Sequence, residues 1–156
     1  MIQGVSIKRL ERHPDERGYF MELGRFDEDT FFNDPGVAQA SLPLRLAGVT
    51  AWHVHPHQVD WWWVAQGDLQ VALIDRRTGS DTFNQVAEFY MGEHYDQSFV
   101  LKIPAGVAHG FRVRLGPMRL LYFTSMTYNE AEEQRLDPRD PELAALYDWF
   151  KPDQVR

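Results

Sequence analysis

Three histidines and one aspartate carry the clearest chemical signal in the chain. His53 and His55 are one residue apart, so on a β-strand both side chains face the same side. Asp60 follows after a short connection, and His109 follows a Pro-x-Gly turn. Three imidazoles and one carboxylate suit Zn²⁺, Mn²⁺, Fe²⁺ or Ni²⁺. The same side chains could instead act as acid and base, or as hydrogen-bonded residues of a core.

Short strand patterns separated by turn residues surround these histidines. Between residues 48 and 127 the predicted strands are interrupted at turn signals such as Gln66-Gly67 and Gly116-Pro117. Strands at intervals of about 8–12 residues are typical of an antiparallel sandwich or barrel. A short helix is expected at residues 26–33, and residues 129–134 and 141–150 also have helical patterns. The sequence therefore predicts one domain over residues 1–156, with a barrel over about 1–128 and a helical tail over about 129–156.

Three consecutive tryptophans follow Asp60. Because side chains alternate along a strand, Trp61 and Trp63 should share one face and Trp62 should lie on the other. Rings in such a cluster usually fill a core or a dimer contact. The alternative is a stacking surface for a nucleobase or a sugar.

Composition and charge exclude several classes of function. The net charge is -7, which disfavours binding to nucleic acid or to an anionic membrane. There are no cysteines, so disulfides and thiolate metal sites are excluded. No apolar run approaches the ~20 residues that span a bilayer. The charged N-terminal segment has no signal-peptide pattern, which favours a cytoplasmic protein.

The two histidine segments resemble the two motifs of the cupin superfamily. Residues 48–67, which contain His53, His55 and Asp60 and end at Gly67, resemble the first motif. Residues 104–111, which contain His109, resemble the second motif. The resemblance implies an all-β fold, a cupin-type antiparallel β-barrel (jelly roll). Many members of this superfamily bind a metal through these positions, and many bind none.

A longer series of motifs resembles the dTDP-4-dehydrorhamnose 3,5-epimerase family. The series covers about residues 4–140 in order: DERGYFME at 15–22, WH at 52–53, LIDRRTGSDTF at 73–83, IPAGVAHGF at 103–111, LYFTSMTY at 121–128 and DP at 137–138. This family epimerises dTDP-4-keto-6-deoxy sugars in carbohydrate biosynthesis. The resemblance implies an isomerase that acts on a nucleotide sugar, without a cofactor, as a homodimer.

The chemistry of that family is proton transfer next to a ketone. Such a reaction needs a base on one side of the sugar, an acid on the other and donors for the enolate oxygen. The resemblance implies that His53 is the base and Tyr122 the acid. It also implies substrate contacts from five residues: Arg17, Glu22, Gln39, His109 and Tyr128.

Several positions differ from the family pattern. The family has arginine at Thr50, lysine at Asp60 and glutamine at His55. It also has a late aspartate that orients the base, for which Asp148 and Asp153 are the available candidates.

These differences keep other interpretations open. His53, His55, Asp60 and His109 could bind a divalent transition metal in a metal-dependent cupin enzyme, or a metal could replace the lysine as the electrophile. Sugar-nucleotide 3,4-ketoisomerases also have a His-x-His motif, and their two histidines transfer protons without a metal. In this chain the corresponding pair would be His53 and His55. A non-catalytic member of the family is the third possibility.

Overall fold

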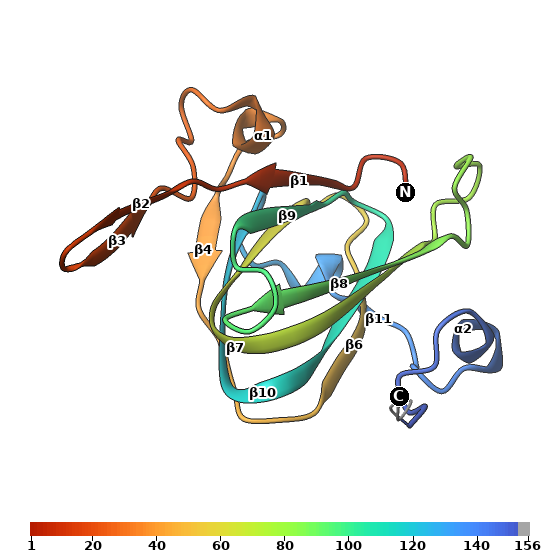
Figure 1. The fold of residues 1–156 in the computed structure, drawn as a ribbon. Helices are drawn as coiled ribbons and strands as arrows, with labels where there is room; N and C mark the ends of the chain where they lie inside the picture. The colour runs from red at the N-terminus through yellow and green to blue at the C-terminus, as the bar shows by residue number, and fades with distance from the viewer. Residues whose placement is uncertain (153–156) are drawn as a thin grey trace.

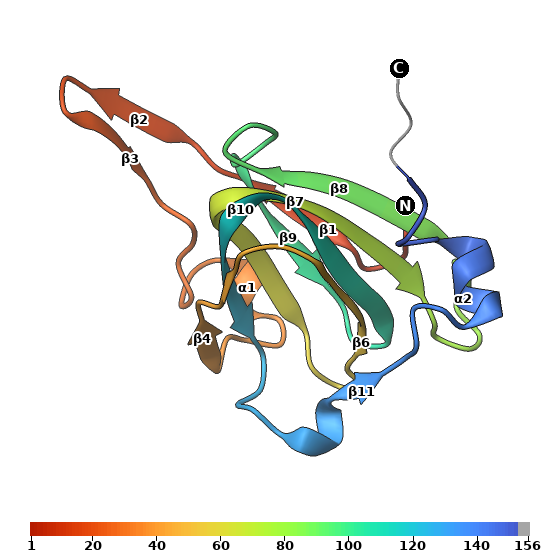
Figure 2. The same cartoon turned by 90° about the horizontal axis from the view of Figure 1, so that it is seen from below.

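The computed structural model describes residues 1–152 as a β-barrel with short flanking helices (Figures 1 and 2). The strands are β1 (Ser6–Arg9), β2 (Arg12–Asp15), β3 (Gly18–Met21), β4 (Gln39–Ser41), β5 (Leu44–Arg45), β6 (Val49–Val54), β7 (Asp60–Asp75), β8 (Val86–Gly92), β9 (Phe99–Ile103), β10 (Val107–Thr124) and β11 (Gln134–Arg135). The helices are α1 (Thr30–Asn33), the 3-10 helix η1 (Glu130–Glu132) and α2 (Pro141–Leu146). All strand pairs are antiparallel.

Two long strands, β7 and β10, are the central pair of the sheet that forms the barrel. They pair with each other along most of their lengths. The first part of β7 also pairs with β9, and its second part pairs with β8. Similarly, β10 pairs first with β6 and later with β4 and β5. Each long strand therefore contributes to both sides of the barrel, and the segments that carry the histidines are brought next to each other.

The expected interruption at Gln66-Gly67 is a bend inside one strand. Gly67 has a positive φ of 73°, and a Cβ there would lie 2.5 Å from the carbonyl oxygen of Leu115. At this point the register between β7 and β10 shifts. Glycine permits both the backbone conformation and the close approach, so β7 bends and continues where the sequence pattern predicts a turn. The predicted break at Gly116-Pro117 likewise lies inside β10.

Side chains alternate between the interior and the outer faces of the barrel. Leu69, Val71 and Leu73 belong to the largest buried cluster, whereas Ala72 and Ile74 belong to a second cluster. The second cluster is covered by Leu143 and Trp149 from the C-terminal segment, and a third by Phe32 of α1. This alternation has the period of two that strand geometry requires.

The tryptophans follow the same alternation. Trp61 and Trp63 pack with the third cluster, and Trp62 packs with the largest one. Trp61 is fully buried and donates its Nε1 hydrogen to the carbonyl of Phe31 at 2.8 Å. The predicted division of the three rings between two faces is therefore confirmed.

The segment after residue 128 is less helical than its pattern predicts. Residues 129–134 form only η1, because the chain then extends and β11 pairs with His53 and Val54 of β6. Trp52 and Leu136 exchange two further backbone hydrogen bonds. α2 begins at Pro141, is capped by Asp140 and ends at Leu146. The backbone N–H and C=O groups on the edge of β6 are thus satisfied by the chain after η1, which becomes part of the sheet.

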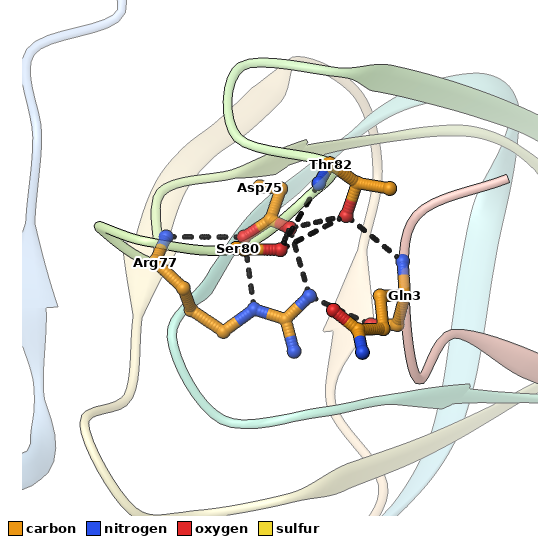
Figure 3. Close-up of polar contacts among 5 residues, drawn as sticks. All are labelled: Gln3, Asp75, Arg77, Ser80 and Thr82. Atoms are coloured by element: carbon orange, nitrogen blue, oxygen red, sulfur yellow. Dashed lines mark hydrogen bonds and ion pairs between the residues drawn. The ribbon is translucent and has the colours of Figure 1, made fainter.

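Two features lie outside the barrel core. The hairpin of β2 and β3 projects to one side (Figure 1), with Tyr19 and Phe20 exposed. At the far end of β7, Asp75 joins the β7–β8 loop to the N-terminal segment through Arg77, Ser80 and Thr82 (Figure 3). None of the helices in residues 1–152 has the length and apolar character needed to cross a membrane.

Candidate active site

A pocket of about 150 Å³ contains most of the residues that the sequence predicts as functional. Seven predicted site residues line it: Gln39, His53, His55, Asp60, His109, Tyr122 and Tyr128. The other residues of the lining are Pro43, Arg45, Thr50, Gln58, Trp62, Gly110, Phe111, Leu120, Thr124 and Glu133. The pocket therefore combines titratable side chains with an apolar and aromatic wall, as small-molecule sites usually do.

Strand alternation on β6 directs the histidines into this pocket. Trp52 and Val54 face the outer cluster, so His53 and His55 face inward. β6 lies directly against β10, where His53 is opposite His109. Gly110 permits this approach, because a Cβ at that position would lie 2.5 Å from the Cβ of Ala51. The glycine next to His109 thus permits β6 and β10 to place His53 and His109 opposite each other, with ring centroids 6.3 Å apart.

His53 has a carboxylate partner that the sequence does not predict. Its Nδ1 lies 3.7 Å from Oε2 of Glu133, and a quarter of its side chain is exposed. Burial lowers the pKa of His53, while the charge of Glu133 acts in the opposite direction. The ring is therefore neutral near pH 7; the nitrogen that faces the Glu133 carboxylate, Nδ1, carries the hydrogen, and Nε2 is the basic atom. A neutral, partly exposed imidazole of this kind can accept a proton from a substrate.

Glu132 holds the loop that carries His55. Its carboxylate accepts hydrogen bonds from the backbone of His57 at 2.9 Å and of Gln58 at 3.2 Å. Its carbonyl oxygen lies 2.8 Å from Nδ1 of His55. A carbonyl can only accept, so Nδ1 of His55 carries the hydrogen.

His109 is held in the same way. Its Nδ1 donates to the carbonyl of Val107 at 3.0 Å, and the residue is 4% exposed. Burial, together with the nearby His55, lowers the pKa of His109 to about 3. The ring is therefore neutral, and its Nε2 lies 3.8 Å from Oδ2 of Asp60.

Asp60 is a buried carboxylate with neutral donors. Gln58 Nε2 donates to Oδ1 at 2.8 Å and Trp62 Nε1 donates to Oδ2 at 3.1 Å. Burial raises the pKa of Asp60, against smaller opposing effects of His55 and of these two hydrogen bonds. The family resemblance implied a lysine as the usual residue here, whereas this chain has a buried carboxyl.

The predicted acid Tyr122 and the predicted contact residues Gln39 and Tyr128 also line the pocket. Tyr122 is on β10, where it pairs with Ser41 of β4 and Trp62 of β7. Gln39 accepts a hydrogen bond from the backbone of Tyr128 at 2.9 Å, which ties two predicted contact residues together at the rim. The side chain of Tyr128 is 70% exposed.

Two predicted contact residues are not brought to the pocket within one chain. Arg17 lies at the turn of the β2–β3 hairpin, where it pairs with Asp15 at 2.7 Å. Glu22 follows the hairpin and pairs with Arg25 at 3.0 Å. Both are exposed, and neither lines the pocket.

Sequence reasoning missed Glu133, Arg45 and Gln58. Glu133 occupies the place expected for Asp148 or Asp153 beside His53; Asp148 lines a separate groove and Asp153 lies outside the described residues. Among the described residues that line the pocket, Arg45 has the permanently positive side chain. The pairing of β11 with β6 and of β5 with β10 brings Glu133 and Arg45 to the pocket, and neither contact has a signal in the local sequence.

Comparisons with known proteins agree with this architecture. The family model described as dTDP-4-dehydrorhamnose 3,5-epimerase matches residues 1–155. The spore coat polysaccharide biosynthesis protein SpsL of Bacillus subtilis is 42% identical over 96% of this chain and 97% of its own length.

Two solved structures have the same fold. NovW, a 4-keto-6-deoxy sugar epimerase from Streptomyces spheroides, has a TM-score of 0.80 and 28% identity over 99% of this chain and 78% of its own. ChmJ, a 3'-monoepimerase from Streptomyces bikiniensis in complex with dTDP-quinovose, has a TM-score of 0.81 and 25% identity over 99% of this chain and 80% of its own.

These matches confirm the all-β, cupin-type fold and favour a sugar-nucleotide epimerase over a metal-dependent cupin enzyme of another class. The family model matches nearly the whole chain, which belongs to the dTDP-4-dehydrorhamnose 3,5-epimerase family of isomerases.

Proposed function

We propose that this enzyme epimerises a dTDP-4-keto-6-deoxy sugar by abstracting a proton from a carbon next to the ketone. The observation that carries the proposal is that His53 and Tyr122 line one pocket, with Glu133 beside His53. Neutral His53 takes the proton and becomes an imidazolium, and the electron pair of the C–H bond moves to the ketone oxygen. Tyr122 then gives its hydroxyl proton to the same carbon from the opposite face, which inverts that centre. Exchange with solvent restores both groups.

Other pocket residues support binding and positioning in this proposal. Arg45 supplies positive charge for the diphosphate of the substrate, while Gln39 and Tyr128 contact the sugar. His109, whose Nδ1 is held by a backbone carbonyl, lines the pocket beside the sugar. Glu133 is a positioning residue, since it acts through His53. Both proton-transfer groups are side chains, so the proton transfers themselves require no cofactor.

We also propose a homodimer in which the β2–β3 hairpin contacts a second copy of the chain. The hairpin has exposed aromatic residues and places Arg17 and Glu22 outside their own pocket. Contact with a second copy would give both residues access to a substrate. Sedimentation of the wild type and of Phe20→Ser measures the dimer; a monomeric wild type would rule this proposal out. A cytoplasmic location remains a prediction.

Deuterium exchange tests the chemistry. The enzyme is incubated in deuterated water with a dTDP-4-keto-6-deoxy sugar, and the label and the configuration at each carbon are measured by NMR. The wild type should incorporate deuterium and invert one or both carbons next to the ketone. His53→Ala should reduce incorporation about 10²–10⁴-fold, the usual contribution of a general base. Tyr122→Phe should slow inversion more than incorporation, because the base alone can exchange the proton.

His94→Gln serves as the histidine control, because His94 is exposed and lies outside the pocket. Equal incorporation by the wild type and by His53→Ala would refute the proposed base. A product in which the ketone itself has moved would favour the ketoisomerase interpretation, in which His53 and His55 transfer the proton.

A further inference from the structure

The floor of the pocket contains three buried side chains whose ligand atoms converge. His55 follows β6, Asp60 begins β7 and His109 lies in β10, and they are 5%, 3% and 4% exposed. One ligand atom from each lies within 4.8 Å of those of the other two. The rings of His55 and His109 are 5.1 Å apart, whereas the ring of His53 is 6.5 and 6.3 Å from them. His53 is not part of this buried group; its ligand atom lies within 4.8 Å of those of His55 and Glu133 instead, in a second set that is only partly buried.

Both histidines of this group are fixed so that they present a lone pair. Each Nδ1 hydrogen is directed to a backbone carbonyl, of Glu132 for His55 and of Val107 for His109. In a neutral imidazole the other nitrogen, Nε2, is then an acceptor. A hydrogen bond from Nδ1 to a carbonyl is the usual way in which proteins orient a metal-binding histidine.

The carboxylate of Asp60 is oriented by neutral groups. Each of its oxygens accepts one hydrogen bond, from Gln58 or from Trp62, and the remaining lone pairs face the histidines. Within residues 1–152 no lysine or arginine forms an ion pair with it. Two nitrogen lone pairs and a buried carboxylate thus face one another, an arrangement that is unfavourable unless a positive charge lies among them.

We propose that His55 Nε2, Asp60 and His109 Nε2 bind one divalent transition-metal ion. Two imidazoles and one carboxylate suit Zn²⁺, Mn²⁺, Fe²⁺ or Co²⁺, whereas Mg²⁺ and Ca²⁺ prefer oxygen ligands alone. Ligand atoms about 2.1 Å from one ion lie roughly 3 to 3.4 Å apart. The 3.8 Å between His109 Nε2 and Asp60 Oδ2 needs only a small contraction to reach this range.

The ion adds one chemical capacity to the proposed function, on which this part of the inference rests. A divalent cation is a Lewis acid and would supply, beside the ketone, the positive charge that the family pattern places on a lysine at position 60. His53 remains free to act as the base, because its Nδ1 faces Glu133 and its ring is outside the convergent group.

Metal binding is measured directly, without reference to activity. Protein purified without a nickel column is treated with a chelator, dialysed and titrated with Co²⁺, whose visible spectrum reports the ligand geometry, and then with Zn²⁺ in competition. Bound metal is counted by elemental analysis. The wild type should bind about one ion per chain with a tetrahedral or five-coordinate cobalt spectrum. Asp60→Asn and His109→Gln should weaken Zn²⁺ binding at least about 100-fold, the upper range for loss of groups that merely orient ligands.

Control variants keep the test decisive. His94→Gln should bind the metal as the wild type does, since His94 lies outside the pocket. His55→Gln introduces the amide usual in the family, and it replaces His109→Gln if that variant does not fold, as judged by circular dichroism. No stoichiometric metal in the wild type would overturn the proposal and would indicate a proton shared among the three residues. Equal affinity in wild type and Asp60→Asn would overturn it as well.

The metal site and the proposed reaction can fail separately. Deuterium incorporation by chelator-treated enzyme that depends on His53, with no metal bound, would refute the metal site and leave the epimerase proposal intact. Stoichiometric metal without deuterium incorporation from any dTDP-4-keto-6-deoxy sugar would do the reverse. Metal-stimulated incorporation that Asp60→Asn abolishes would support both.

Discussion

Asp60 and Asp75, the first and last residues of β7, are both buried aspartates, but their surroundings differ. Asp75 is fully buried and receives five hydrogen bonds from the backbone and guanidinium of Arg77 and the hydroxyls of Ser80 and Thr82 (Figure 3). Asp60 is 3% exposed and receives two, both from neutral side chains.

The two carboxyls consequently have opposite pKa shifts. Burial alone would raise the pKa of Asp75, but the hydrogen bonds from Arg77, Thr82 and Ser80 outweigh it and hold the pKa well below its usual value. At Asp60 burial prevails and raises the pKa. The carboxylate of Asp75 is thus saturated by hydrogen-bond donors and joins chain segments. The carboxylate of Asp60, on the same strand, keeps free lone pairs that are available for chemistry.

The largest expected effect on stability is at Asp75. Asp75→Ala leaves the Arg77 guanidinium and two hydroxyls without their partner, and should lower the free energy of unfolding by about 3–5 kcal/mol. Urea denaturation measures the change. Asp81→Ala, which removes an exposed carboxylate from the same loop, should stay within about 0.5 kcal/mol of the wild type. Equal losses in both variants would contradict the structural role of Asp75.

Acid should remove the contribution of Asp75 gradually. Its folded-state pKa is lower than in the unfolded chain, so this stabilisation is present above the usual aspartate value and is lost as pH falls toward the folded-state pKa. The difference in stability between wild type and Asp75→Asn should therefore shrink below about pH 4, by at most about 1.4 kcal/mol per pH unit. Urea titrations from about pH 2.5 to 7 test this, and a difference independent of pH would refute it.

The smallest effect on stability is expected at Asp60. In chelator-treated protein, Asp60→Asn removes an undercompensated buried charge and keeps the size and one acceptor of the side chain. The free energy of unfolding should change by less than about 1 kcal/mol. A loss as large as that of Asp75→Ala would mean that Asp60 has a structural role, and the contrast between the ends of β7 would then fail.

The sequence predicted those parts of the molecule that depend on local periodicity and motif order. Strand alternation correctly divides Trp61 and Trp62 between two faces, and the histidine motifs predict that His53 and His109 lie near each other. The bend at Gly67 could not be distinguished from a turn, because a glycine with positive φ serves either purpose.

Residues brought in by distant pairing were the ones missed. Glu133 reaches His53 only because β11 pairs with β6, and Arg45 reaches the pocket through β5 and β10. Residues 129–134 have a helical pattern but form only a short 3-10 helix, because the chain then pairs with the edge of β6. This tertiary hydrogen bonding overrides the local preference and cannot be predicted from a short stretch of sequence. Arg17 and Glu22 are absent from the pocket of their own chain, so nothing in the local sequence or in one chain places them at the predicted site.

The late position of η1 in the chain determines when its contacts with the two histidines can form during synthesis on the ribosome. Glu132 fixes the His55 loop and Glu133 faces His53, yet 77 residues separate His55 from Glu132. The strands that carry the histidines are synthesised first, and the parts that hold His55 and accompany His53 emerge seconds later, at about 5–20 residues per second. A nascent chain that has already collapsed around β7 and β10 would thus lack the contacts of Glu132 and Glu133 with the two histidines until residues 130–135 emerge and join β6.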